Sequence, residues 1–167
     1  YFETYYDNGR SQKPVSVIKP TNNNWNLQFV STPEEADVVL LWLIPNGGGL
    51  FSSEGTAIDL QLSKNRIDVA HVNQLKTGKP TIVVVNYTNP WVIDEIDNGD
   101  LKSVLATFGT TQEALLDVLT GKFNPSGKMP FTTPASMKVV LENKADVPGY
   151  LEPKGYALFN FGEGLSY

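Results

Sequence analysis

Hydrophobic and polar residues are interspersed along most of the chain, but two stretches are continuously apolar. Residues 37–43 are apolar after their first position, and residues 80–85 are rich in the β-branched side chains that suit a pleated strand. Continuous apolar runs of this length are typical of strands that are buried on both faces of a parallel sheet. We therefore expect two central strands at these positions.

A helical pattern lies between the two predicted strands. Residues 64–76 place Ile67, Val72 and Leu75 at helix-compatible spacing, and Gly78 follows as a stop signal. A strand, a helix and a second strand in this order predict a βαβ unit with parallel strands.

Shorter segments continue the alternation of strands and helices. The pattern predicts strands over residues 1–6, 25–30 and 101–108, and helices over residues 33–36, 90–96 and 111–119. From Phe123 onward Pro and Gly recur too often for long helices, so the tail is expected to wrap the surface as loops and short strands. The predicted fold is α/β, a doubly wound and mostly parallel sheet with helices on both faces (an α/β sandwich), in a single domain over residues 1–167.

Composition limits the kinds of partner. The 167 residues carry 13 Lys and Arg against 18 Asp and Glu, a net charge of −5, with no basic run to neutralise a phosphate backbone, so we expect no nucleic acid partner. The apolar runs are far shorter than the roughly 20 residues that a membrane helix needs. The lack of cysteine excludes disulfides and thiolate metal sites, and no group of His, Asp and Glu has the spacing of metal ligands. We expect neither a membrane span nor a metal site.

Two further expectations concern the wider context of the chain. The compartment stays open, with a secreted or periplasmic location slightly favoured over a cytoplasmic one. The chain opens without Met or a signal-peptide pattern, and its first residues already favour a strand. We therefore expect a fragment of a longer polypeptide.

Two motifs in the last third of the chain carry the most specific signal. Residues 119–132 read LTGKFNPSGKMPFT, and residues 161–167 read FGEGLSY. Both resemble, in order and spacing, segments of the second domain of family 3 glycoside hydrolases, which read DVLxGxxNPSGKLPxTFP and FGYGLSY. The resemblance implies an α/β sandwich domain that lends a loop to an active site built mainly on another domain, and a hydrolysis that needs no cofactor.

The same resemblance implies a partner. In this family the nucleophile is an aspartate in an SDW-like motif on a (β/α)8 barrel, and the present sequence contains no such motif. We therefore expect an N-terminal (β/α)8 barrel domain that carries the nucleophile, in the same polypeptide or as a separate chain. A β-linked oligosaccharide or glucoside is the implied substrate.

The loop after the first buried strand contains the candidate catalytic residue. Ligands bind at the carboxyl ends of strands in open α/β sheets. The loop, residues 44–60, has three consecutive glycines without the G-x-G-x-x-G order, which favours a flexible hinge over a phosphate cradle. Its segment around Glu54 resembles the GEGxDRxxLxLP-type segment of the family, whose glutamate is the general acid/base in many members. Leu50 and Phe51 would raise the pKa of such an acid by desolvation. A solvated carboxylate without a catalytic role is the alternative.

The chain departs from the family pattern in several places, among them a PGQEGG-like turn that here reads FGTTQEAL over residues 108–115, without the glycine pair. Leu60 follows Asp59 where the family has arginine, and Ser53 replaces the glycine before the glutamate. Glu163 replaces the central tyrosine of the FGYGLSY motif. We therefore assign Glu163 no substrate role.

Two tryptophans and the single histidine are further candidates for a functional role, and each also has a purely structural interpretation. Trp91 follows the exit of the second buried strand and is the candidate substrate-binding residue, because its ring could stack on a sugar. Trp42 is expected in the core, and His71 at the surface or in an interface of the crossover helix. Residues 86–88 spell a glycosylation acceptor, which stays unassigned.

Taken together, these features predict the second domain of a retaining, exo-acting β-glycosidase of the β-glucosidase type, inactive as an isolated chain. Two alternatives stay open. The substrate could be a β-xyloside or an N-acetylglucosaminide, because the residues that select the sugar lie mostly on the barrel. The chain could also be a non-catalytic carbohydrate-binding or packing domain.

Overall fold

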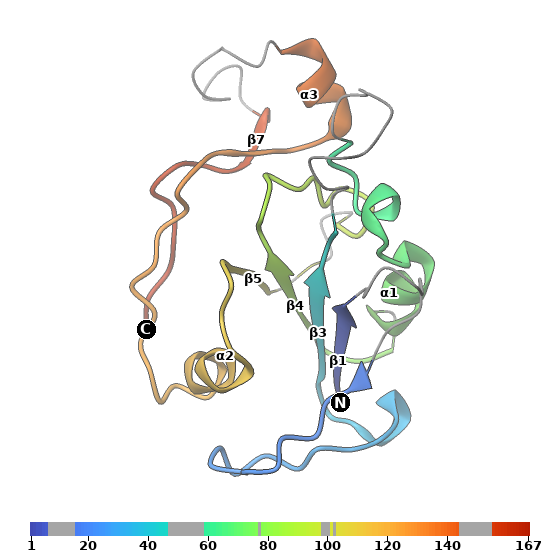
Figure 1. Ribbon diagram of the computed structural model, residues 1–167, viewed down its shortest axis with the longest axis vertical. Coiled ribbons are helices and arrows are strands. Elements are labelled where there is room, and N and C mark those ends of the chain that lie inside the picture. Colours follow the sequence, from blue (N-terminus) through green and yellow to red (C-terminus); the bar gives the residue numbers. More distant parts are fainter. Residues whose placement is uncertain (7–15, 47–58, 77, 98–100, 102, 144–154) are drawn as a thin grey trace.

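The computed structural model describes residues 1–6, 16–46, 59–76, 78–97, 101, 103–143 and 155–167. These residues form a five-stranded sheet in the order β2-β1-β3-β4-β5 (Figure 1). Its strands are β1 (Phe2–Tyr6), β2 (Ser16–Val17), β3 (Val39–Ile44), β4 (Thr81–Asn86) and β5 (Val104–Thr107). β1, β3, β4 and β5 are parallel, and β2 pairs antiparallel with β1. The predicted, mostly parallel sheet is confirmed.

Helices cover both faces of this sheet. α1 (Val69–Lys76) and α2 (Gln112–Leu119) lie on opposite sides of it (Figure 1). In β3, Leu41 belongs to the core on the α1 side and Trp42 to the core on the α2 side. Because successive side chains of a strand point to opposite faces, each apolar run contributes to two cores at once. The predicted α/β sandwich, with Trp42 in the core, is confirmed.

Most predicted elements correspond to observed ones. The runs at 37–43 and 80–85 form β3 and β4, whose residues Leu41 and Val83 pair in register and are both fully buried. Residues 1–6, 33–36, 101–108 and 111–119 contain β1, the 3-10 helix η1 (Pro33–Glu35), β5 and α2. The hydroxyl of Thr111 accepts a hydrogen bond from the Ala114 N–H at 3.3 Å and caps α2.

The predicted strand over residues 25–30 is wrong. Asn26 has a left-handed backbone with φ of 54°. The side chain of Asn23 forms hydrogen bonds with both the N–H and the carbonyl of Leu27. Such side-chain to backbone bonds compete with strand pairing, so this segment bends instead of extending along the sheet.

The predicted helix over residues 90–96 is also wrong. Trp91, Val92 and Ile93 are all 0% exposed. A surface helix buries only one stripe of its circumference, so it cannot bury three consecutive side chains. Val92 instead pairs with Gln61 in a parallel bridge, and this extended pairing replaces the helix.

The predicted crossover helix over residues 64–76 is divided into two pieces. The 3-10 helix η2 (Ser63–Asn65) ends at Arg66, whose φ of 65° lies in the left-handed region. α1 then begins at Val69, and the Asp68 carboxylate accepts a hydrogen bond from the His71 N–H at 3.0 Å. The connection from β3 to β4 is therefore helical, as expected, but its α-helix is shorter.

The tail forms the loops and short elements that its Pro and Gly content predicts. These are β6 (Thr133–Pro134), α3 (Met137–Glu142) and β7 (Ala157–Phe159). The two carboxyl-terminal motifs run side by side (Figure 1). The Met129 N–H donates to the Glu163 carbonyl at 2.8 Å, and the Tyr167 N–H donates to Oδ1 of Asn124 at 2.8 Å. The two motifs therefore form one paired ribbon.

Candidate functional site

The carboxyl ends of the parallel strands meet at one edge of the sheet, where the candidate site is expected. The candidate acid/base Glu54 belongs to residues 47–58, which lie outside the described residues. The structure describes both flanks of this loop, which end at Asn46 and Asp59. The geometry of the site is therefore built from these flanks and from the strand ends beside them.

Asn65 connects the two flanks. Its backbone carbonyl accepts a hydrogen bond from the Asn46 N–H at 3.1 Å. Its side-chain amide donates to the carbonyl of Asp59 at 2.7 Å and to that of Gln61 at 2.6 Å. Asn65 is only 4% exposed, so these bonds form away from water. One buried residue thus fixes where the loop leaves and re-enters the domain.

The flank after the loop is attached to the core. The Val92 N–H donates to the Leu60 carbonyl at 3.0 Å. The Glu95 carboxylate accepts hydrogen bonds from the N–H of Ser63, at 3.0 Å, and from its hydroxyl. The segment that contains Asn65 is therefore held against buried residues of the connection between β4 and β5.

Asn86 organises the end of β4. Its Oδ1 accepts hydrogen bonds from the Gly109 N–H at 2.9 Å and from the Thr107 hydroxyl at 3.3 Å. Gly109 has φ of 79°, which favours glycine at the turn after β5. Asn86 is 9% exposed, so in the folded chain its side chain is engaged in the edge of the sheet. This geometry disfavours the glycosylation acceptor at residues 86–88.

Trp91, the candidate substrate-binding residue, lies in the core. It is 0% exposed, and its Nε1 donates to the Asn86 carbonyl at 3.1 Å. Sugar stacking requires an open ring face, and the Trp91 ring has no exposed surface in the described structure. The geometry gives Trp91 a packing role at the base of the candidate site.

Three aromatic rings gather at the same edge. The ring centroids of Tyr87, Phe108 and Phe131 lie 6.0 to 6.3 Å from one another. Tyr87 is buried, and its hydroxyl has no hydrogen-bond partner among the described residues. Burial raises the pKa of Tyr87 above its ordinary value. Phe108 is 49% exposed and presents an apolar surface beside the strand ends.

The other carboxylates considered from the sequence lie in different surroundings. Asp94 lies in a turn of the β4 to β5 connection, and desolvation, followed by the nearby Glu95, raises its pKa. Asp37 is exposed and precedes β3, at the opposite edge of the sheet from the loop. Glu163 accepts a hydrogen bond from the Asn160 N–H at 2.7 Å, which gives it a local structural contact. The surroundings of these three side chains identify none of them as a catalytic carboxylate.

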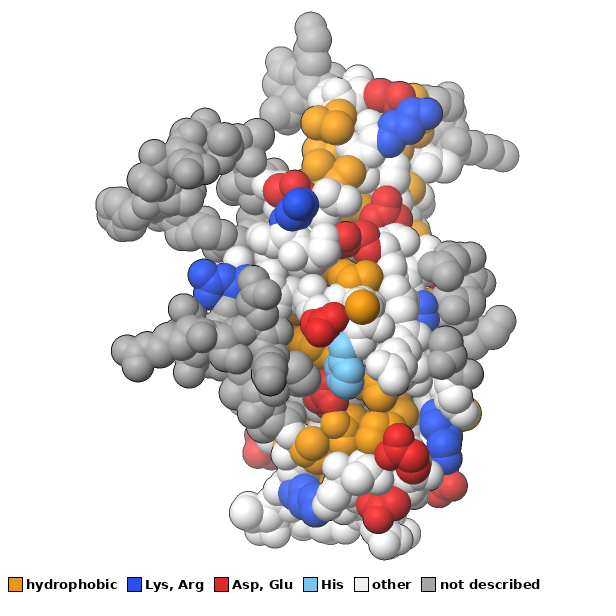
Figure 2. Space-filling view, turned by 90° about the vertical axis from the view of Figure 1, so that its right-hand side faces the viewer, with side chains coloured by type: hydrophobic (Ala, Val, Ile, Leu, Met, Phe, Trp, Pro, Cys, Tyr) orange, Lys and Arg blue, Asp and Glu red, His pale blue; other side chains and the backbone are white. Residues whose placement is uncertain are grey.

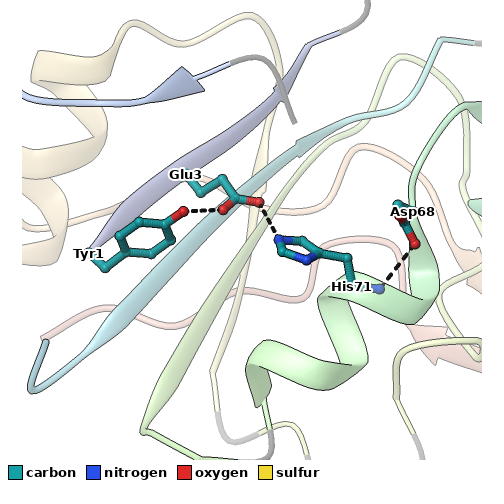
Figure 3. Close-up of polar contacts among 4 residues, drawn as sticks. All are labelled: Tyr1, Glu3, Asp68 and His71. Atoms are coloured by element: carbon teal, nitrogen blue, oxygen red, sulfur yellow. Dashed lines mark hydrogen bonds and ion pairs between the residues drawn. The ribbon is translucent and has the colours of Figure 1, made fainter. Parts of the chain in front are cut away.

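His71 forms a polar contact that the sequence did not reveal. Its Nε2 lies 3.0 Å from Oε1 of Glu3 on β1, and the Tyr1 hydroxyl donates to the other oxygen of Glu3 (Figure 3). His71 is the only histidine in the sequence, and Figure 2 shows the histidine side chain at the surface on the α1 side. This agrees with the surface or interface position expected for it. The contact belongs to the packing of α1 on β1.

Sequence reasoning missed Asn65 and Glu3. Asn65 falls inside a predicted helix, where an asparagine carries no signal of a buried contact. Glu3 lies in a strand in which Phe2 and Thr4 point to the other face. Only their distant partners, which the fold brings close, show what these side chains do.

No helix in the described ranges is long and apolar enough to cross a membrane. The described residues also contain no group of three or more His, Asp or Glu side chains that could hold a metal ion.

The architecture is that of an α/β sandwich domain. The sequence matches the model of the family described as "Glycosyl hydrolase family 3 C-terminal domain" over residues 4–167. The chain belongs to this family, which confirms the resemblance drawn from its motifs.

Curated relatives of the chain are named as β-glucosidases. The chain is 36% identical over 148 residues to "Probable beta-glucosidase C" of Aspergillus flavus and 34% identical over 143 residues to "Beta-glucosidase C" of Emericella nidulans. These matches cover 86% and 85% of the chain, and the chain spans 22% of the length of each relative. It is 29% identical to a "Periplasmic beta-glucosidase/beta-xylosidase" of Dickeya chrysanthemi, over 83% of the chain and 21% of that relative.

A solved structure has a similar fold. A family 3 β-glucosidase of Neurospora crassa matches with a TM-score of 0.57 at 24% identity. The match covers 77% of this chain and 18% of that chain. This likeness supports the same fold for the described domain.

Proposed function

We propose that the chain is the second domain of a retaining, exo-acting β-glycosidase of the β-glucosidase type. The observation that carries this proposal is the 36% identity to a protein named as a β-glucosidase, over 86% of the chain. Because the chain spans only 22% of that relative, the activity belongs to a larger assembly in this proposal.

In this proposal Glu54 is the general acid/base. A retaining glycosidase needs a carboxylate nucleophile and a carboxylic acid about 5 to 5.5 Å apart; the acid protonates the leaving oxygen and then, as a base, activates water. The described flanks of the Glu54 loop support this role, because they follow β3 at the edge where open α/β sheets bind ligands. The motif around Glu54 supports it independently.

The nucleophile comes from a partner in this proposal. An N-terminal (β/α)8 barrel domain, in the same polypeptide or as a separate chain, provides the aspartate that attacks the anomeric carbon. A general acid/base without the nucleophile cannot complete a double displacement. The isolated 167-residue chain should therefore hydrolyse no β-glycoside. Robust turnover of an aryl β-glucoside by the isolated chain would refute this part of the proposal.

A β-xyloside is the second substrate considered. The relative from Dickeya chrysanthemi is named for both β-glucosidase and β-xylosidase activity. Hydrolysis of aryl β-glucoside and of aryl β-xyloside by the full-length or reassembled protein distinguishes the two possible substrates. The ratio of their kcat/KM values identifies the preferred sugar.

The test uses the full-length or reassembled protein with Glu54→Gln. Loss of a general acid/base should lower kcat by roughly 100- to 10,000-fold. Azide should partly restore turnover and release the β-glucosyl azide, because an anion can attack the glycosyl-enzyme without a general base. Glu142→Gln is the control, since the interaction of Glu142 within the described residues is an exposed pair with Lys138 at 3.7 Å.

Unchanged activity of Glu54→Gln would place the acid elsewhere. The chain would then act as a non-catalytic carbohydrate-binding or packing domain. A similar loss in Glu142→Gln would indicate a general effect on folding, and the activity would then have to be compared at equal amounts of folded protein.

A further inference from the structure

A cavity with a volume of about 680 Å³ lies between the segment that follows β2 and helix α2. This volume falls within the range of about 300–1,000 Å³ that is usual for small-ligand pockets. One wall comes from residues 19–25 and the other from residues 112–122. Both walls lie toward the end of the domain at which the parallel strands begin, opposite α3 and β7 (Figure 1).

Contacts between the two walls fix the shape of this cavity. Nε1 of Trp25 donates to Oδ1 of Asp117 at 2.7 Å, and the ammonium group of Lys122 lies 5.8 Å from the centre of the Trp25 ring. The same ammonium group donates to the carbonyl of Asn24. Trp25 is 8% exposed and belongs to the core on the α2 side, so the cavity is anchored in the core. A site with fixed walls loses little conformational freedom when a ligand binds.

The charges that line the cavity balance one another. Lys19 and Lys122 supply two ammonium groups, and Glu113 and Asp117 supply two carboxylates. An anion in the cavity would be repelled by the carboxylates, and a cation would be repelled by the ammonium groups. This lining therefore favours a ligand without net charge.

Uncharged polar residues add further hydrogen-bonding groups to the lining. The side chains of Thr21, Asn22 and Gln112 form no hydrogen bond with other described residues. Hydroxyl and amide groups can both donate and accept hydrogen bonds, which matches the hydroxyl groups of a sugar. Pro20 and Trp25 are the apolar residues of the lining, so an apolar ligand would find few partners. A neutral ligand with many hydroxyl groups fits this mixture.

We propose that this cavity binds a neutral oligosaccharide. Its hydroxyl groups bind the amides of Asn22 and Gln112 and the carboxylate of Glu113, and the cavity holds the ligand without cleaving it. The choice of a neutral, hydroxyl-rich ligand rests on the lining of the cavity, whereas the choice of a β-linked chain rests on the proposed function.

The test measures the binding of cellotetraose to the full-length or reassembled protein by isothermal titration calorimetry. The active site is first blocked with 2,4-dinitrophenyl 2-deoxy-2-fluoro-β-glucoside, which leaves a stable glycosyl-enzyme on a retaining glycosidase. We expect the blocked protein still to bind cellotetraose. Failure of the reagent to label the protein would overturn the proposed function, but the effect of cavity variants on binding would still test the cavity.

Asn22→Ala and Glu113→Ala remove one group from each wall. Both residues are exposed, so both variants should fold. The dissociation constant should rise by roughly 2- to 10-fold for Asn22→Ala, which loses an uncharged partner, and by roughly 10- to 100-fold for Glu113→Ala, which loses a charged one. Gln28→Ala and Glu142→Ala are the matched controls, because both residues are exposed and neither lines the cavity.

Three results would overturn the proposal: no binding of cellotetraose to the blocked protein, wild-type affinity in both cavity variants, or equal losses in cavity variants and controls. Two further probes test the class of ligand. Equal binding of maltotetraose, whose linkages are α, would overturn the choice of a β-linked chain. Tighter binding of inorganic phosphate than of cellotetraose would overturn the choice of a neutral ligand.

Discussion

The carboxylate of Glu3 on β1 lies 3.0 Å from Nε2 of His71 on α1, so a buried acid of the sheet is bound by the crossover helix (Figure 3). Glu3 is 2% exposed, and the Tyr1 hydroxyl donates to its second oxygen. A carboxylate in such a place is costly unless it is hydrogen-bonded. The contact therefore couples the position of α1 to the first strand.

His71→Ala tests this coupling. It should lower the free energy of unfolding by about 1–3 kcal/mol, because the Glu3 carboxylate would remain buried without one of its partners. Urea denaturation measures the change. The double variant Glu3→Gln with His71→Ala buries no carboxylate and should recover part of the loss, whereas wild-type stability of His71→Ala alone would contradict the coupling.

Gly164 allows the two carboxyl-terminal motifs to approach each other. A Cβ at Gly164 would lie 2.5 Å from the carbonyl oxygen of Gly127, closer than real Cβ contacts. Gly164→Ala should therefore separate the paired ribbon and cost about 1–3 kcal/mol of stability, the usual range for overpacking.

Gly127→Ala provides the control for this prediction. A Cβ at Gly127 meets nothing within 4 Å, although the residue lies in the same ribbon. Its effect on the urea midpoint should correspond to no more than about 0.5 kcal/mol. Equal effects of the two variants would show that the close approach at Gly164 does not limit the ribbon.

The sequence is most informative where one physical rule determines the structure. Residues 37–43 and 80–85 are apolar on both sides of the strand, and a strand covered on both faces buries the side chains of such a run. Thr111 caps α2 through a contact three residues away, at Ala114, which local reasoning can anticipate. The fold class and its central elements follow from such local or periodic signals.

The sequence is least informative where distant residues decide. Residues 90–96 contain Pro90 and a helix-like pattern, but the bridge from Val92 to Gln61 and the burial of Trp91 outweigh that preference. The part of Asn65 in joining the two loop flanks depends on Asp59 and Asn46, which come together only in the folded chain. Such contacts between distant residues cannot be read from the local pattern of a single sequence.

Trp91→Phe separates packing from substrate contact. The Trp91 ring is 0% exposed, and its Nε1 donates to the Asn86 carbonyl at 3.1 Å. Phenylalanine removes that donor and part of the ring volume, so the free energy of unfolding should fall by about 1–3 kcal/mol. The KM for aryl β-glucoside in the full-length or reassembled protein should stay within about 2-fold of wild type. A large increase in KM without loss of stability would support the substrate contact expected from the sequence.

Tyr87 predicts a specific dependence of stability on alkaline pH. Burial raises its pKa above the ordinary value of 10.0, because the phenolate would lose its hydration. Above about pH 10 the unfolded chain therefore releases the Tyr87 proton while the folded chain retains it. The folded state then binds more protons than the unfolded state, so the free energy of unfolding falls as the pH rises.

Tyr87→Phe should remove this contribution. Near pH 7 the variant should be as stable as wild type or more stable, because the hydroxyl that it loses is buried without a partner among the described residues. Above pH 10 its stability should fall less steeply, by up to about 1.4 kcal/mol per pH unit for one titrating group. Burial also raises the pKa of Tyr1 and Tyr5, so part of the alkaline slope should remain. Urea denaturation at several pH values measures both slopes, and identical slopes would show that Tyr87 titrates alike in the folded and unfolded chains.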